Sequence, residues 1–230
     1  KMIGIIGAMT EEVAALKKQM IVKEERCIHQ IPFYLGTLAN RDIVLMQSGI
    51  GKVNAAYSTT LLMEHFEIDT LINIGTAGGL NLKENVGDVV IGKEICYYDV
   101  DVTPDRVYGQ IPGMPERFQA DPKLDAMTAE VLDELKIPYH CALIVSGDQF
   151  VSREDQVDLI KQHFPEAMCA EMEACSIAQI AYLYQVPMIV LRSLSDIFGK
   201  GGNAVQFEEY LEVASYHSAL LCKAVVEKLA

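Results

Sequence analysis

The chain has 230 residues, half of them hydrophobic, and a formal net charge of −13 at pH 7. This length suits one globular domain with a substantial core, and we expect residues 1–230 to form it. Nucleic-acid binding is disfavoured because phosphate contacts need clustered Lys and Arg, and an acidic surface also repels anionic lipid. We therefore expect no nucleic-acid partner and no membrane association.

The six cysteines lack CxxC spacing, and the five histidines lack the spacing of paired metal ligands. We expect no metal and no other cofactor, and we expect reduced thiols, which are typical of a cytoplasmic protein. Residues 2–7 have the pattern of a strand and are too short for a secretory signal.

The hydrophobic pattern predicts strands and helices that alternate along the chain. In chain order we expect a strand at 2–7, a helix at 11–20, a hairpin of strands at 33–37 and 43–47, a helix at 53–66, strands at 70–74 and 87–91, an irregular excursion at 99–121, a helix at 122–135, a strand at 142–146, a helix at 153–163, a helix after residue 173, a strand at 186–191 and a helix from 205 to the end. Such alternation predicts a single α/β domain with three layers, α/β/α, around a mixed, largely parallel, twisted sheet.

Acidic residues occupy both ends of the crossover between residues 170 and 196. Glu173 precedes the helix, and Asp196 follows the buried strand. Parallel strands joined by a helix end at the same edge of a sheet, so we expect the two carboxylates to be neighbours where α/β sheets bind ligands. Paired carboxylates are typical of enzymes that cleave glycosidic bonds. The structural alternative is that Glu173 caps a helix and Asp196 ends a strand.

Polar and glycine-rich segments also follow the other strands, at 8–12, 48–52, 75–79 and 146–150. Together with apolar Met9, Ile50, Phe150 and Met172 they predict a small-molecule pocket. In the first segment Thr10 suits a helix N-cap, and either Glu11 or Glu12 faces the pocket while the other stabilises the first turn.

Neither glycine-rich stretch, at 4–7 or at 75–79, has GxGxxG spacing, which argues against a dinucleotide site. Gly51-Lys52 is similar to the end of a P-loop. Met46 and Val53, however, occupy positions where that motif needs Gly and Ser or Thr, which argues against an NTPase.

Taken together and in order, these segments resemble bacterial 5′-methylthioadenosine/S-adenosylhomocysteine nucleosidases of the nucleoside phosphorylase-like superfamily. The resemblance covers essentially the whole chain. It is carried by residues 3–12, 48–53, 73–80, 86–90, 101–103, 108–113, 145–150, 171–174 and 192–196 and by Phe207.

The resemblance implies hydrolysis of adenine nucleosides, namely methylthioadenosine, adenosylhomocysteine and 5′-deoxyadenosine. Asp196 is similar to the general acid that protonates adenine, Glu12 to the base that deprotonates water, and Glu173 to the acceptor of ribose hydroxyl hydrogen bonds. The other matched positions bind substrate or support these groups: Met172 at base and sugar, Phe150 stacked on adenine, the Val151 backbone at the adenine edge, Met9, Ile50 and Phe207 around the 5′-alkylthio group, Thr76 near the acid and water, and Ser195 and Arg192 as supports.

A departing adenine needs a proton, because it leaves poorly as an anion. We therefore predict that burial and neighbouring acids raise the pKa of Asp196. Two other functions remain as alternatives: a purine nucleoside or methylthioadenosine phosphorylase, and a non-catalytic nucleoside sensor. Asn73, where phosphorylases of this superfamily carry an arginine, and Glu12 favour water over phosphate as the nucleophile, because carboxylates repel phosphate.

The resemblance also implies a homodimer, in which Val102 and Pro112 of the long excursion close the neighbouring subunit's pocket. This chain departs from the family at Pro104-Asp105-Arg106, where relatives usually carry aromatic residues. We expect this change to alter the part of the pocket that receives the 5′ substituent.

Overall fold

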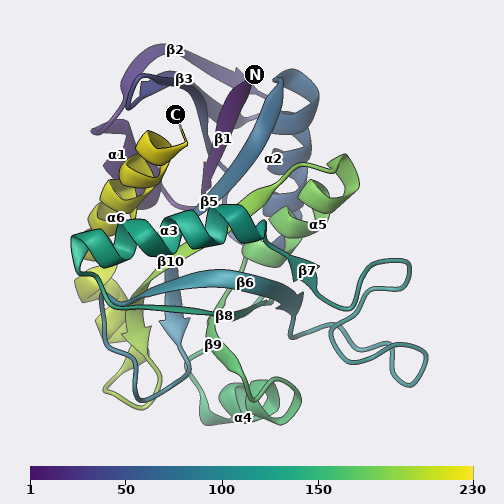
Figure 1. The fold of residues 1–230 in the computed structure, drawn as a ribbon. Coiled ribbons are helices and arrows are strands. Elements are labelled where there is room, and N and C mark those ends of the chain that lie inside the picture. Colours follow the sequence, from purple (N-terminus) through teal and green to yellow (C-terminus); the bar gives the residue numbers. More distant parts are fainter. Residues whose placement is uncertain (230) are drawn as a thin grey trace.

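The computed structural model describes residues 1–229 (Figure 1). The strands and helices follow in the order β1 (Met2–Gly7), α1 (Thr10–Lys17), β2 (Ile21–Ile28), β3 (Ile31–Leu38), β4 (Arg41–Gln47), α2 (Lys52–His65), β5 (Ile68–Gly79), β6 (Val89–Tyr97), β7 (Phe118–Gln119), α3 (Pro122–Leu135), β8 (Tyr139–Ser146), α4 (Glu154–His163), β9 (Ala167–Glu171), α5 (Ala174–Tyr184), β10 (Met188–Ile197) and α6 (Asn203–Lys228). None of the helices in residues 1–229 combines the length and apolar character that a bilayer crossing requires.

The strands form one mixed sheet in the order β10-β6-β8-β9-β5-β1-β4-β3-β2, with β7 on β6. Strand β10 also pairs with β5, so the strands from β10 to β5 close into a ring. Parallel pairs join β1 to β4 and β5, β5 to β10, and β8 to β6 and β9. Antiparallel pairs build the β2-β3-β4 meander and join β10 to β6 and β9 to β5.

Helices cover both faces of this sheet, which confirms the predicted three-layer α/β/α class. Helices α1, α3 and α6 pack on one face, and α2 and α5 on the other (Figure 1). Side chains alternate between these faces along each strand, as the pleat requires. Thus Ile72 and Ile189 pack with Val225 of α6, whereas Leu71 and Val190 pack on the opposite side.

Several strands differ from the sequence-based prediction. Strand β2 was not expected, because its middle residues 23–26 are charged and exposed at the edge of the sheet. Strand β5 continues past residue 74 through Gly79, and β10 continues past residue 191 through Ile197. The glycine-rich and polar residues at these ends adopt strand conformation because β5 and β10 pair with each other along this stretch.

The crossover that leads to Asp196 also has a different geometry. Strand β10 runs parallel to β5, whereas β9 runs antiparallel to β5, so the prediction of parallel strands on either side of α5 is wrong. The closed ring nevertheless brings the segment after β9 and the end of β10 to the same place.

Residues 99–117 form the predicted irregular excursion between β6 and β7. The segment projects from the body of the molecule as two loops, seen in teal at the right of Figure 1.

Candidate active site

A cavity of about 250 Å³ lies where the ring of strands meets α1 and α6. Most of the predicted pocket residues line it: Met9, Glu12, Ile50, Thr76, Phe150, Met172, Glu173, Arg192, Ser195, Asp196 and Phe207. The remaining lining residues are Ala8, Ala77, Gly78, Ala170 and Glu171. The cavity thus combines apolar walls with several buried acids, the composition of a small-molecule site.

Glu12 is the acid of the first segment that faces the cavity, and Glu11 is exposed to solvent. Glu12 Oε1 accepts hydrogen bonds from the backbone N–H groups of Ala8 (2.9 Å) and Met9 (2.8 Å), and Oε2 accepts one from Thr76 (2.8 Å). Met9, rather than Thr10, is the N-cap, and Glu12 closes the capping box. Burial raises the pKa of Glu12, while Arg192 and the three N–H groups favour its charged form.

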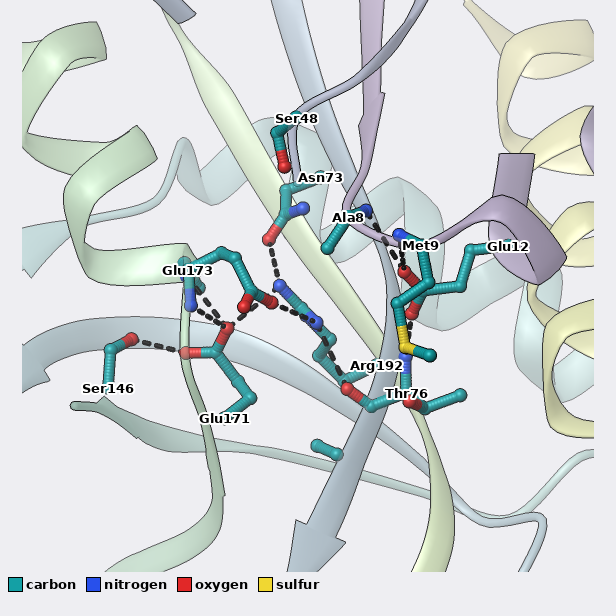
Figure 2. A network of polar contacts seen from close by, with 12 residues as sticks. Ala8, Met9, Glu12, Ser48, Asn73, Thr76, Ser146, Glu171, Glu173 and Arg192 are labelled. Atoms are coloured by element: carbon teal, nitrogen blue, oxygen red, sulfur yellow. Dashed lines mark hydrogen bonds and ion pairs between the residues drawn. The ribbon is translucent and has the colours of Figure 1, made fainter. Parts of the chain in front are cut away.

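Arg192 lies at the centre of the polar groups and is almost fully buried. Figure 2 shows its guanidinium between Glu171 and Glu173 on one side and Thr76, with Glu12, on the other. Nη2 lies 2.8 Å from Glu171 Oε2, and Nη1 lies 3.6 Å from Glu173 Oε1. The guanidinium also donates to Asn73 Oδ1 (2.7 Å) and to the carbonyl of Thr76 (3.0 Å). These partners hold it rigidly within the site.

Glu171, and not Glu173, provides the side-chain acceptor for the backbone N–H groups at the start of α5. Its Oε2 accepts hydrogen bonds from the backbone N–H groups of Glu173 (2.9 Å) and Ala174 (2.7 Å), and its Oε1 accepts one from Ser146. Glu173 occupies the N-cap position, but its side chain makes no capping bond. The alternative in which the Glu173 side chain serves only to cap the helix is therefore wrong, and its carboxyl lines the cavity.

The Glu173 carboxyl has its own anchor. Its Oε2 accepts a hydrogen bond from the backbone N–H of Gly51 (3.0 Å), at the start of α2. Burial raises the pKa of Glu173 to about 8, opposed by the charge of Arg192 and reinforced by that of Glu171. This group therefore changes its charge within the range where enzymes commonly operate.

Asp196 is buried near the end of β10, beside an irregularity in its register with β5. Ser195 Oγ lies 2.9 Å from Oδ1 and donates to it, and Asn203 Nδ2 donates to Oδ2 over 2.9 Å. Burial raises the pKa of Asp196, and these two donors oppose the rise. The predicted direction is thus confirmed, with burial rather than neighbouring acids as the cause.

Two aromatic rings stand at the edge of the cavity. The ring centroids of Phe150 and Phe207 are 5.5 Å apart in an edge-to-face arrangement, and Phe150 is partly exposed. Together with Met9, Ile50 and Met172 they supply the apolar walls that the sequence predicted. A planar aromatic ligand fits such walls well.

Val151, Val102 and Pro112 lie outside the cavity lining. Val151 follows Phe150 and packs against the cluster under α4. Val102 and Pro112 belong to the excursion, where Val102 is half-buried and Pro112 exposed. The cavity of a single chain is therefore formed without the excursion.

Sequence reasoning missed three residues that support the site: the cap Glu171, Asn73 as a partner of Arg192, and Asn203 as a partner of Asp196. A buried Asn between Ile72 and Ile74 in a strand was a usable signal, because buried amides need partners. The position of Asn203 carried no such signal, since it depends on how α6 docks. Among residues 1–229, no cluster of His, Cys, Asp and Glu has the arrangement of a metal site.

Comparisons with known proteins identify the family. Residues 2–229 match the model of the phosphorylase superfamily. A 5′-methylthioadenosine/S-adenosylhomocysteine nucleosidase of Oceanobacillus iheyensis is 46% identical over 228 residues, which cover 99% of each chain. The chain belongs to the 5′-methylthioadenosine/S-adenosylhomocysteine nucleosidase family. The resemblance inferred from the strand-end segments is thereby confirmed.

Solved structures of this family share the whole fold. The nucleosidase of Neisseria meningitidis, in complex with methylthio-immucillin-A, superimposes with a TM-score of 0.94 at 37% identity over 99% of both chains. The futalosine hydrolase of Helicobacter pylori gives a TM-score of 0.93 at 30% identity, over 99% of this chain and 98% of its own. The fold therefore accommodates more than one nucleoside specificity.

Proposed function

We propose that this chain hydrolyses the N-glycosidic bonds of 5′-methylthioadenosine and S-adenosylhomocysteine, and of 5′-deoxyadenosine, and releases adenine. The main support is that Asp196, with a raised pKa, and Glu12, held by three backbone donors, line one apolar-walled cavity. Relatives of high identity over the full length carry the name of this activity.

Asp196 is the general acid in this proposal. Burial raises the pKa of the carboxyl and so favours the protonated form, which gives its proton to the adenine ring as the glycosidic bond lengthens. The proton offsets the negative charge that develops on the departing base. Such a positioned acid contributes about 10²–10⁴-fold to the rate.

Glu12 is the base that orients and deprotonates the attacking water. Oε1 already accepts two backbone hydrogen bonds and Oε2 only one, so Oε2 retains an acceptor site for water. Glu173 accepts hydrogen bonds from the ribose hydroxyls, and the nearby carboxylates stabilise the positive charge that the sugar acquires.

The remaining lining residues bind the two ends of the substrate. Phe150 stacks on adenine, and Met172 lies against base and sugar. The backbone at Val151, which follows Phe150 outside the cavity lining, would lie along the adenine edge. The apolar 5′ substituent lies against Met9, Ile50 and Phe207. The acid, the base and the water are positioned by Thr76, Ser195 and Arg192.

The same proposal includes a homodimer. Val102 and Pro112 lie on the excursion, away from the cavity of their own chain, and would complete the pocket of the partner. Sedimentation equilibrium tests this arrangement, which requires a mass of two chains. Replacing Asp105 with Phe tests the departure in this segment, and an unchanged KM for both substrates would exclude its influence.

Product analysis without phosphate tests the reaction itself. Methylthioadenosine, adenosylhomocysteine and futalosine are incubated separately with the protein, and the released base and sugar are quantified by chromatography. We expect adenine and free methylthioribose from methylthioadenosine, and a loss of about 10²-fold or more in Asp196→Asn. Asp125→Asn is the matched control, because Asp125 is also buried, with a pKa raised to about 7, but lies on α3.

Each alternative has its own outcome in this experiment. A phosphate requirement with a ribose 1-phosphate product would identify a phosphorylase, and binding without adenine release would identify a sensor. Turnover of futalosine in place of methylthioadenosine would overturn the substrate assignment. Full activity of Asp196→Asn would refute the role of the acid.

A further inference from the structure

Phe150 reaches the cavity from an irregular segment, residues 147–153, that joins β8 to α4. Its ring is 42% exposed, so packing alone does not hold it. A side chain on such a segment keeps a fixed place only where the backbone is held on both sides of it. The bonds that hold residues 147–153 therefore determine the shape of this part of the cavity wall.

A single buried amide, that of Gln156 in the first turn of α4, holds the segment on both sides of Phe150. Gln156 is only 6% exposed. Its Oε1 accepts hydrogen bonds from the backbone N–H groups of Ser152 (2.9 Å) and Arg153 (3.0 Å), which follow Phe150. Its Nε2 donates to Oε1 of Gln149 (3.1 Å), which directly precedes Phe150. This last bond is the Gln149–Gln156 bridge.

The chemistry of the donors fixes the orientation of both amides. Backbone N–H groups can only donate, so Gln156 must turn its oxygen toward Ser152 and Arg153. Its nitrogen then faces Gln149, and because an amide nitrogen only donates, Gln149 must present an oxygen to it. The bridge therefore requires a hydrogen-bond acceptor at position 149.

Tyr98 provides a second anchor for Gln149, from the opposite end of the segment. Its hydroxyl donates to the backbone carbonyl of Gln149 over 3.2 Å, and its side chain is almost fully buried. The Tyr98 ring also packs on Gly147, where any Cβ would collide with it. After Phe150, Val151 packs against the cluster under α4. Both ends of the segment are thus fixed to the body of the fold, and the bridge joins them.

From these contacts we infer that Gln156 and Gln149 are positioning residues, which hold Phe150 in the cavity wall through their mutual hydrogen bond. This inference rests on the proposed function, in which Phe150 stacks on the base of the substrate. Both side chains lie outside the cavity lining and act through Phe150. A segment that is already ordered loses little conformational freedom when a ligand binds, so the bridge strengthens binding and leaves the chemical step to other residues.

The structural alternative is that Gln156 only completes the capping box of α4. Capping uses its Oε1 alone, and the bond from Nε2 to Gln149 adds nothing to the helix. Gln149 is exposed, so a substitution there removes the bridge and leaves the cap in place. Variants at position 149 therefore separate positioning from capping.

The test measures KM and kcat for methylthioadenosine, and Kd for adenine by calorimetry, in the wild type, Gln149→Leu and Gln149→Glu. Leu offers no acceptor to Gln156, whereas Glu retains one. We expect Gln149→Leu to raise KM and the adenine Kd by about three- to tenfold, with kcat within about twofold and Tm unchanged. Gln149→Glu should remain within about twofold of the wild type in all three constants.

Substitution of Gln156 tests the other end of the bridge. Gln156→Leu removes the cap and the bridge together, so we expect a rise in KM with a lower Tm. Adding Gln149→Leu to this variant should raise KM no further, because the shared bond is already lost. Gln162→Leu is the matched control, since Gln162 is exposed on the same helix, and all constants should be unchanged. If Gln156→Leu does not fold, the variants at position 149 decide.

An unchanged KM in Gln149→Leu, or equal rises in Gln149→Leu and Gln149→Glu, would overturn the inference. A fall in kcat at constant KM would overturn it as well, because the bridge would then act on the chemical step. Absence of adenine release by the wild type would refute the proposed function itself. Release with the same KM in the wild type and Gln149→Leu refutes only the role of the bridge.

Discussion

Arg192 Nη2 lies 2.8 Å from Glu171 Oε2, and the exposed fractions of the two side chains are 1% and 3%. The pair connects the parts of the site, because Glu171 caps α5 next to Glu173 while Arg192 contacts the carbonyl of Thr76, whose N–H holds Glu12. One cation therefore balances the acids that surround the proposed sugar site.

Replacing Arg192 with Met should destabilise the protein strongly. Loss of one partner of a buried ion pair leaves an uncompensated charge, which costs about 3–5 kcal/mol. Urea unfolding measures the change. The control is Arg153→Met, which removes an exposed pair with Asp155 and should alter the free energy of unfolding by less than about 0.5 kcal/mol. Equal midpoints for the wild type and Arg192→Met would show that the pair contributes nothing.

The titration of Glu173 predicts a specific dependence of stability on pH. Its pKa is about 8 in the folded chain, against an ordinary value of 4.5, so the folded state binds more protons between these limits. This contribution is fully present below 4.5 and is lost as the pH rises through 8. Glu173→Gln has no such titration, so its Tm minus that of the wild type should rise between pH 5 and 9, by about 2–4 °C for each kcal/mol of stability that the wild type loses. A Tm difference that does not vary with pH would contradict the shift.

Gly75 should tolerate no side chain. A Cβ at this position would collide with Glu12 Oε2 and would lie 2.8 Å from Arg192 Nη1. We expect Gly75→Ala to displace the proposed base and to lower kcat/KM by about 10²-fold, as misplacement by about 1 Å does. Gly87→Ala is the control for backbone strain, since Gly87 also has a positive φ but open space around it. Similar activity in the two variants would show that the collision is unimportant.

Lys52, Asp99 and Asp148 should act together in substrate binding. Lys52 Nζ lies 2.9 Å from Asp99 Oδ1, the Asp148 N–H donates to Asp99 Oδ2 (2.9 Å), and the Lys52 N–H donates to Asp148 Oδ1 (2.8 Å). These bonds tie the Gly51 turn, which holds Glu173, to the loop that carries Phe150.

Asp99→Asn should therefore raise KM by about fivefold, the equivalent of about 1 kcal/mol, with kcat nearly unchanged. Steady-state kinetics measures the effect. Lys17→Met, which breaks an exposed pair with Glu25 elsewhere, should leave both constants unchanged. A fall in kcat at constant KM would assign this group of residues to the chemical step instead.

The sequence predicted the three layers of the fold and most of the residues that line the cavity. Both depend on local properties, namely the hydrophobic period and the polar residues at strand ends. Sequence-based prediction failed where pairing overrides local preference. The run Gly75-Thr76-Ala77-Gly78-Gly79 resembles a loop, yet it continues β5 because β10 supplies its hydrogen bonds. No strand was predicted at residues 21–28, because β2 is an edge strand whose charged middle has both faces largely exposed.

The supporting residues show the same limit. Position in the sequence did not distinguish Glu171 from Glu173 as the cap of α5, since both precede the helix within three residues. Asn203 meets Asp196 only because α6 docks across the end of β10. Contacts of this kind depend on the relative placement of elements, which periodicity does not encode.

Glu12 both completes the capping box of α1 and faces the cavity. Its loss would leave the N–H groups of Ala8 and Met9 without an acceptor as well as removing a carboxylate from the site. In a homologue without catalytic activity, substitution of Glu12 would therefore still destabilise the beginning of α1. The acid at this position is thus favoured by folding stability even where selection on turnover is weak.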